Sequence, residues 1–127
     1  MNRSILIIED NAENRYLATY LLEASGWNVS HAAEGVEGIA AARKLRPAII
    51  LLDIQLPDIN GYEVARRLRA DPATMSIPIL AVTSHAMAGD RQAALAAGCS
   101  GYIEKPIDPA TFVADIEGLA PEASPSR

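Results

Sequence analysis

The sequence has few of the residues on which secreted or nucleic-acid-binding domains depend. Its one cysteine, Cys99, cannot form an internal disulfide framework, so we expect a reducing compartment. Lysine and arginine total 11 against 16 aspartates and glutamates, and the net charge of -5 argues against nucleic-acid binding. No apolar run reaches the roughly 20 residues of a membrane span, and a strand-like run follows the first residues without a signal peptide. These absences predict a cytoplasmic protein that contacts neither nucleic acid nor membrane.

Aromatic residues are also scarce, with one tryptophan, one phenylalanine and four tyrosines. Because half of the 127 residues are apolar, a core is still expected, built from isoleucine, leucine, valine and alanine. This length is typical of one domain. We expect the domain to span residues 1–119, and the Pro- and Ser-rich residues 120–127 to form a disordered tail.

Short apolar runs alternate along the chain with longer amphipathic ones. The short runs are continuous rather than alternating, which is typical of strands covered on both faces. The predicted strands are Ser4–Ile8, Trp27–Ala32, Ala48–Leu52, Ile77–Val82 and Gly101–Ile103. The predicted helices are Glu13–Ser25, Gly35–Arg46, Gly61–Ala70, Ala88–Ala97 and a last helix with Asp108 as its N-cap and Pro109 at its first position. Five β–α units in succession predict an α/β fold with a parallel sheet and helices on both faces, a doubly wound arrangement.

Polar residues follow the carboxyl ends of four predicted strands, where doubly wound sheets bind their ligands. Those residues are Glu9 and Asp10, then Asp53, Thr83 and Lys105. A strand order of 2-1-3-4-5 would make these four strands neighbours. Three carboxylates form an all-oxygen site of the kind that Mg²⁺ prefers, with Mn²⁺ as an alternative. An ammonium and a hydroxyl beside them suit a phosphoryl group, and Asp53 on the central strand is the natural nucleophile.

Four stretches carry a resemblance to a known family: ILIIEDN, IILLDIQLPDINGYE, ILAVTSHAM and GYIEKPI. In this order and spacing they resemble the receiver domain of response regulators in two-component signalling, over about residues 4 to 119. The resemblance implies a flavodoxin-like fold with five parallel strands in the order 2-1-3-4-5 and five helices.

The resemblance also implies a role for each residue of the site. Asp53 matches the phospho-acceptor, and Lys105 matches the lysine that contacts the phosphate, with the Lys105–Pro106 peptide bond expected to be cis. The Mg²⁺ ligands would be Asp53, Asp10, Glu9 through water, and the backbone carbonyl of Gln55.

Further residues match the switch of the family. Thr83 matches the hydroxyl that moves towards the phosphate, and Tyr102 matches the aromatic that fills the vacated space. From the residues alone, Thr83 could instead cap a helix, and Tyr102 could be an ordinary strand aromatic. The side chains of Gln55 and His85 match positions that tune phosphate hydrolysis.

The expected function is that of a phospho-accepting regulator, which catalyses only its own phosphorylation and dephosphorylation. The donor would be a histidine kinase or a histidine phosphotransfer protein. The signal would leave by protein–protein contact through the surface of the helix Ala88–Ala97, the strand Gly101–Ile103 and the last helix, towards an unidentified partner. We favour a stand-alone regulator. A receiver excised from a hybrid histidine kinase and a scaffold that works without phosphorylation are the alternatives.

Two other functions fit the sequence less well. A phosphatase of the haloacid dehalogenase type needs a second aspartate as general acid, where this chain has Gln55. A flavin or dinucleotide binder needs a glycine- or hydroxyl-rich loop after the first strand, where this chain has EDNAEN.

Overall fold

A computed structural model describes residues 3–84 and 89–119 of the chain. Its five strands are β1 (Ser4–Ile8), β2 (Asn28–Ala32), β3 (Ile49–Asp53), β4 (Ile79–Thr83) and β5 (Gly101–Glu104). Its five helices are α1 (Ala12–Ala24), α2 (Gly35–Leu45), α3 (Gly61–Ala70), α4 (Asp90–Ala96) and α5 (Phe112–Leu119). The strands form one parallel sheet in the order β2-β1-β3-β4-β5, which confirms the predicted fold class and order.

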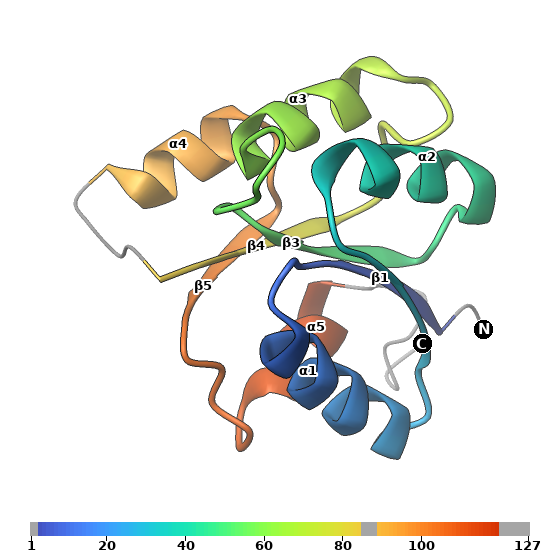
Figure 1. Ribbon diagram of the computed structural model, residues 1–127, viewed down its shortest axis with the longest axis vertical. Coiled ribbons are helices and arrows are strands. Elements are labelled where there is room, and N and C mark those ends of the chain that lie inside the picture. Colours follow the sequence, from blue (N-terminus) through green and yellow to red (C-terminus); the bar gives the residue numbers. More distant parts are fainter. Residues whose placement is uncertain (1–2, 85–88, 120–127) are drawn as a thin grey trace.

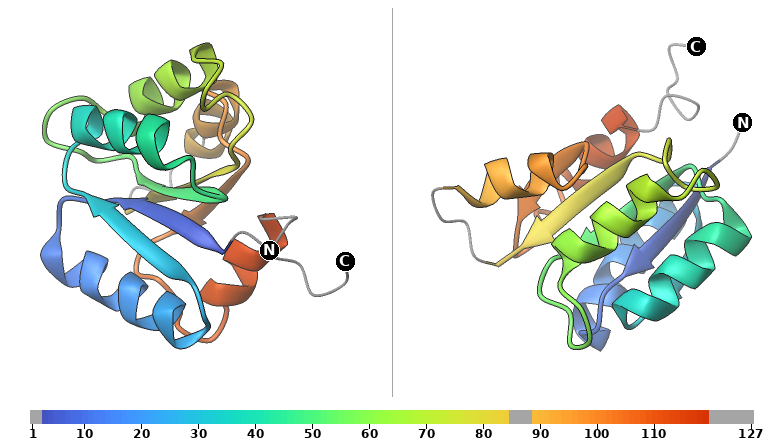
Figure 2. Two further views of the ribbon diagram at one scale, coloured as in Figure 1. Left: turned by 90° about the vertical axis from the view of Figure 1, so that its right-hand side faces the viewer. Right: turned by 90° about the horizontal axis from the view of Figure 1, so that it is seen from above.

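Helices cover both faces of this sheet, with α2, α3 and α4 on one face and α1 and α5 on the other (Figures 1 and 2). Each face has its own apolar cluster, and alternate residues of one strand serve both. In β1, Leu6 and Ile8 belong to the cluster beneath α2 and α3, whereas Ile5 and Ile7 belong to the cluster beneath α1 and α5. Burial on both faces is the reason that the strands read as continuous apolar runs.

The loops that follow the strands are held by short-range caps and close packing. The side chain of Asn11 accepts a hydrogen bond from the backbone N–H of Asn14 at 2.9 Å, so it caps α1. The side chain of Asn60 caps α3 in the same way. At Gly61 an added Cβ would lie 2.6 Å from the carbonyl oxygen of Asp53, so the start of α3 packs directly against the end of β3. This contact fixes the backbone that carries Asp53.

The last two helices begin later than the sequence predicts. The helix α4 starts at Asp90, because Gly89 is its N-cap and has a φ of +96°. Residue 88, at which the sequence predicts the start of this helix, lies outside the described part of the chain. The helix α5 starts at Phe112, whereas the sequence predicts Pro109 at its first position. The Asp108 carboxylate accepts the N–H of Ala110 as an N-cap side chain would, and the Asp108 carbonyl accepts the N–H groups of Thr111 and Phe112 at 3.1 and 2.9 Å, so a turn at residues 109–111 leads into the helix. The prediction of a disordered tail concerns residues 120–127, which also lie outside the described residues.

Candidate functional site

The predicted site residues lie together at the carboxyl edge of the sheet because the strand register places them there. Asp53 at the end of β3 pairs with Val82, and Thr83 at the end of β4 pairs with Glu104. The backbone N–H of Lys105 donates to the carbonyl of Thr83 at 2.8 Å. The members of the site differ in exposure to solvent: Asp53 and Thr83 are only 2% and 1% exposed, whereas Asp10 is exposed.

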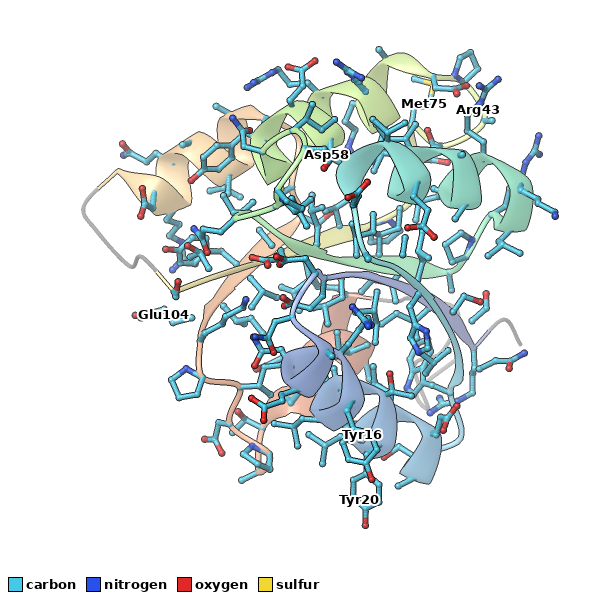
Figure 3. The ribbon with its side chains drawn as sticks, in the orientation of Figure 1. Tyr16, Tyr20, Arg43, Asp58, Met75 and Glu104 are labelled. Atoms are coloured by element: carbon cyan, nitrogen blue, oxygen red, sulfur yellow. The ribbon has the colours of Figure 1, made fainter. Side chains whose placement is uncertain are left out.

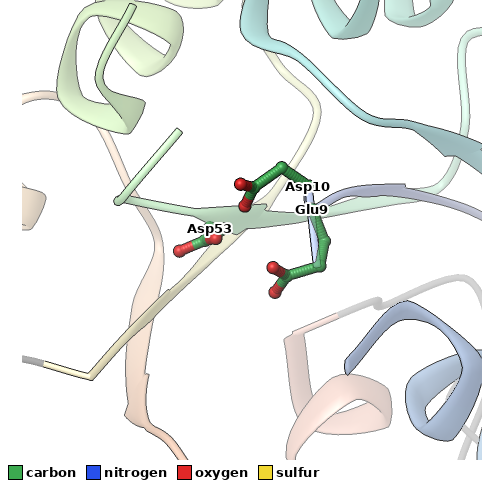
Figure 4. Close-up of side chains that lie close together, drawn as sticks. All are labelled: Glu9, Asp10 and Asp53. Carbon is green, nitrogen blue, oxygen red and sulfur yellow. The ribbon is translucent and has the colours of Figure 1, made fainter. Parts of the chain in front are cut away.

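Three carboxylates meet at this edge. One oxygen from each of Glu9, Asp10 and Asp53 lies within 4.8 Å of the others, and Figure 4 shows the three side chains converging from β3 and the loop after β1. Glu9 is also held by its neighbours, since its carboxylate accepts the N–H of Asn11 at 3.1 Å. An all-oxygen set with this excess of negative charge fits a hard divalent cation such as Mg²⁺.

The Lys105 ammonium lies between two of these acids. Its Nζ is 3.0 Å from Oε1 of Glu9 and 3.3 Å from Oδ2 of Asp53. Burial opposes the charge of the ammonium, but the two carboxylates outweigh it and the pKa of Lys105 is raised. The lysine is therefore charged and placed beside the carboxylate that the sequence indicates as the nucleophile. The Lys105–Pro106 peptide bond is cis, as expected.

The carboxylate of Asp53 has an unusual protonation equilibrium. Burial and the adjacent Glu9 carboxylate raise its pKa to about 7, against the opposing effects of the Gln55 N–H and the Lys105 ammonium. The Gln55 N–H donates to Oδ1 of Asp53 at 3.0 Å. Asp53 therefore exchanges its proton near neutral pH when the site holds no metal.

A hydrogen-bonded connection between two loops was not foreseen from the sequence. The side-chain amide of Gln55 donates to Oγ1 of Thr83 at 2.8 Å, and its carbonyl oxygen accepts from the backbone N–H of Ser84 at 3.2 Å. The Thr83 side chain therefore belongs to the site, and it does not cap α4, whose N-cap is Gly89. A glutamine two residues after a buried aspartate was the available signal, but no local rule identifies its distant partner.

A second unforeseen contact comes from the same loop. The Asp58 carboxylate accepts the N–H groups of Gly35 and Val36 at 2.8 and 2.9 Å, and it caps α2 from outside that helix. Figure 3 shows Asp58 beside the start of α2. These two N–H groups, Val36 first, lower the pKa of Asp58 to about 2. The loop between β3 and α3 thus bonds to both the site and α2.

Two other residues that the sequence assigns to the site, Tyr102 and His85, lie apart from the acidic cluster or outside the described residues. Tyr102 is partly buried and packs against the apolar cluster beneath α2 and α3, which also includes Ala94 of α4. His85 lies outside the described residues. The chemical roles assigned to all of the site residues, from the phospho-acceptor Asp53 to the Gln55 carbonyl and Tyr102, stay predictions. Among the described residues, no helix has the length and apolar character that crossing a membrane requires.

Comparisons with known proteins match most of the chain to one family. The sequence profile described as "Response regulator receiver domain" matches residues 5–117. The polar-differentiation response regulator DivK of Brucella anthropi is 41% identical over 123 residues, which are 97% of this chain and 100% of the relative. DivK of Brucella ovis is 40% identical over the same shares.

Two solved structures are similar in fold. A putative response regulator from Chloroflexus aurantiacus has a TM-score of 0.90 and 28% identity, over 95% of this chain and 99% of that one. The receiver domain of the sensor histidine kinase PA1611 from Pseudomonas aeruginosa has a TM-score of 0.87 and 31% identity over the same shares. That receiver domain is described with a magnesium ion coordinated in its active-site cleft.

Proposed function

Because the chain belongs to the response regulator receiver domain family, we propose that Asp53 accepts a phosphoryl group from a phosphohistidine in a Mg²⁺-dependent reaction. The chain is a signalling protein of two-component systems and not a classical enzyme. One observation supports this proposal above the others. A buried aspartate at the end of the central strand has two carboxylates within 4.8 Å and the Lys105 ammonium at 3.3 Å.

In the proposed reaction, an Asp53 oxygen forms the new bond to phosphorus as the bond between phosphorus and the donor histidine nitrogen breaks. The Gln55 N–H holds Oδ1 of Asp53, and Lys105 lies beside Oδ2. An ammonium at that position stabilises the oxygens of the transferred group by charge. Asp53 must be ionised to react, so its raised pKa makes the metal-free site poorly reactive below neutral pH.

The metal would be held by Asp10 and Asp53, by Glu9 through water, and by the backbone carbonyl of Gln55. Bound Mg²⁺, or Mn²⁺ in its place, would neutralise charge on the transferred group. The three carboxylates also repel one another, and Lys105 offsets only part of that repulsion.

The switch would act through Thr83. Its hydroxyl accepts a hydrogen bond from Gln55, and we propose that it exchanges this partner for the phosphoryl group on Asp53. Tyr102 would then fill the space that Thr83 leaves, biasing an equilibrium between two arrangements. The change would reach partners through the surface of α4, β5 and α5, because Lys105 and Thr83 are directly hydrogen-bonded between β4 and β5.

The phosphodonor would be a histidine kinase or a histidine phosphotransfer protein, as the family implies. The DivK relatives, matched over their full length, favour a stand-alone regulator. The similarity to the receiver of a sensor histidine kinase keeps an excised receiver as the second candidate. The cytoplasmic location, the lack of contact with nucleic acid or membrane and the domain limits of 1–119 stay predictions.

The test is the intact mass of the protein after incubation with acetyl phosphate, with Mg²⁺ or with a chelator. We expect one added phosphoryl group with Mg²⁺ and none with the chelator. Asp53→Asn should remove the adduct, and Asp58→Asn, in the same loop, should retain it. An adduct on Asp53→Asn would contradict the assignment. No adduct with the wild type, using either acetyl phosphate or a phosphorylated histidine phosphotransfer protein, would favour the phosphorylation-independent scaffold.

A further inference from the structure

Of the three carboxylates in the acidic cluster, that of Asp10 is held least by contacts of its own. The carboxylates of Glu9 and Asp53 lie beside the Lys105 ammonium, at 3.0 and 3.3 Å. Within residues 3–84 and 89–119, the exposed Asp10 carboxylate makes no hydrogen bond or ion pair. One of its oxygens still lies within 4.8 Å of the other two acids, and Figure 4 shows Asp10 turned towards Asp53. The backbone must therefore place this side chain.

The backbone that leads into Asp10 is held on both sides of Glu9. The N–H of Glu9 donates to the carbonyl of Ala32 in β2 at 3.0 Å. Nη1 of Arg15 donates to the carbonyl oxygen of Glu9 at 2.8 Å. This carbonyl belongs to the planar peptide unit that joins Glu9 to Asp10, so holding it restricts the direction in which the Asp10 side chain leaves the backbone.

Arg15 is better suited to holding this backbone than to neutralising the acids. It is the fourth residue of α1 and is partly buried. Among the described residues its guanidinium forms no ion pair, and its hydrogen bond goes to a neutral carbonyl six residues earlier in the chain. A hydrogen bond from a charged donor is stronger than one between neutral groups. The guanidinium therefore anchors the loop that carries Glu9 and Asp10.

Two simpler roles for Arg15 lead to different expectations. If the guanidinium acted only through its charge, removing it would leave the acidic cluster with less positive charge nearby, and Mg²⁺ would bind more tightly. If it only stabilised the start of α1, removing it would lower the stability and leave the affinity for Mg²⁺ unchanged. Weaker binding of Mg²⁺ is expected only if Arg15 helps to place Asp10.

We propose that Arg15 is a positioning residue of the metal site, and that its bond to the Glu9 carbonyl keeps Asp10 beside Asp53 before a cation binds. A site that is already arranged binds its ligand more tightly, since less ordering is needed on binding. The inference rests on the proposed function, which assigns Asp10 and Asp53 to Mg²⁺.

The test is a titration of the isotope-labelled protein with Mg²⁺, with the amide signals of Asp10 and Asn11 followed by NMR. Arg15→Met removes the donor but keeps a long side chain, and it should weaken the binding of Mg²⁺ about fivefold to tenfold. Arg15→Lys keeps the charge and a donor group, so it should weaken binding by less than about threefold. At saturating Mg²⁺ both variants should form the acetyl phosphate adduct within about twofold of the wild-type rate, because only the affinity for the metal changes.

A spectroscopic signature and a control variant separate this role from stability alone. In Arg15→Met the carbonyl carbon signal of Glu9 should shift, because that carbonyl loses a charged donor. Arg69→Met is the control, since Arg69 also donates to backbone carbonyls, those of Gly98 and Ile77. It should lower the Tm at least as much as Arg15→Met does and leave the affinity for Mg²⁺ unchanged.

Unchanged or tighter binding of Mg²⁺ by Arg15→Met would overturn the proposal, and so would equal weakening by Arg69→Met. An unshifted Glu9 carbonyl signal would also overturn it. Arg15→Gln, whose side chain is too short for this bond, should weaken Mg²⁺ as Arg15→Met does, and it takes the place of that variant if Arg15→Met does not fold.

The two proposals fail separately. If the wild type binds Mg²⁺ and Asp53 takes up the phosphoryl group, but Arg15→Met binds Mg²⁺ as the wild type does, only the inference about Arg15 is wrong. If Arg15→Met weakens Mg²⁺ as expected but no adduct forms on Asp53 of the wild type, the role of Arg15 is supported and the phosphorylation proposal is wrong. A wild type that binds no Mg²⁺ would overturn both.

Discussion

Asp53 at the end of β3 and Asp58 in the loop that follows lie five residues apart, and their environments shift the pKa of the carboxyl group in opposite directions. Asp53 is buried beside Glu9, and its pKa is raised to about 7. Asp58 is exposed and accepts two backbone N–H groups from α2, and its pKa is lowered to about 2. Burial near like charge destabilises the first anion, whereas backbone donors stabilise the second. The loop therefore holds one carboxylate that is suited to chemistry and one that is suited to structure.

The largest expected effect concerns the cation beside Asp53. Lys105→Met should slow the formation of the acetyl phosphate adduct about 100-fold, because it removes the charge that faces the transferred group. The rate is measured by intact mass against time at saturating Mg²⁺. Lys44→Met removes an exposed lysine of α2 and is the matched control, for which we expect the wild-type rate. A Lys105→Met variant that reacts at the wild-type rate would remove this lysine from the proposed chemistry.

The positions of most site residues could be predicted from the sequence because they depend on local pattern. A buried parallel strand is a continuous apolar run, and the residue after it lies at the edge of the sheet. The strand limits were accordingly predicted to within two residues, as for β4, predicted at Ile77–Val82 and found at Ile79–Thr83. Glu9, Asp10 and Asp53 meet for this reason.

Long-range contacts could not be predicted in this way. Asp58 caps a helix that starts 23 residues earlier, and Gln55 bonds to Thr83, 28 residues later. Neither spacing has a periodic signature, because the partners are brought together by the sheet and not by the local chain. The late start of α5 is a local difference, since Asp108 holds the N–H groups of residues 110–112 in the turn that precedes the helix.

The two aspartates should also affect stability in opposite directions. Since the folded state raises the pKa of Asp53, the stability linked to its proton is present below its unfolded pKa near 4 and is lost as the pH rises through 7. With chelator at pH 8, Asp53→Asn should therefore raise the free energy of unfolding by about 2 kcal/mol, allowing for the partner that Lys105 loses. Urea unfolding at pH 5 and pH 8 measures this, and the gain should shrink towards pH 5.

Asp58 provides the comparison, measured by thermal unfolding of the same protein. Its pKa is lowered, so its contribution is present above pH 4 and is lost as the pH falls towards 2. Asp58→Ala should lower the Tm by about 4 °C at pH 8, because α2 loses its cap. Asp58→Asn keeps one acceptor oxygen and should lower the Tm by less than Asp58→Ala does. Destabilisation by Asp53→Asn at pH 8 would mean that the Lys105 pair outweighs the repulsion from Glu9.

The smallest effect tests whether the two ends of the loop are independent. Gln55→Ala removes the acceptor of the Ser84 N–H, and amide hydrogen exchange at Ser84 should become about fivefold faster, the value for one modest hydrogen bond. The amides of Gly35 and Val36 should exchange as in the wild type, since Asp58 still holds them. Asp58→Ala should give the reverse pattern and serves as the crossed control. If either variant speeds exchange at both ends, the loop moves as one unit, and a change at Asp53 would then reach α2 as well as β5.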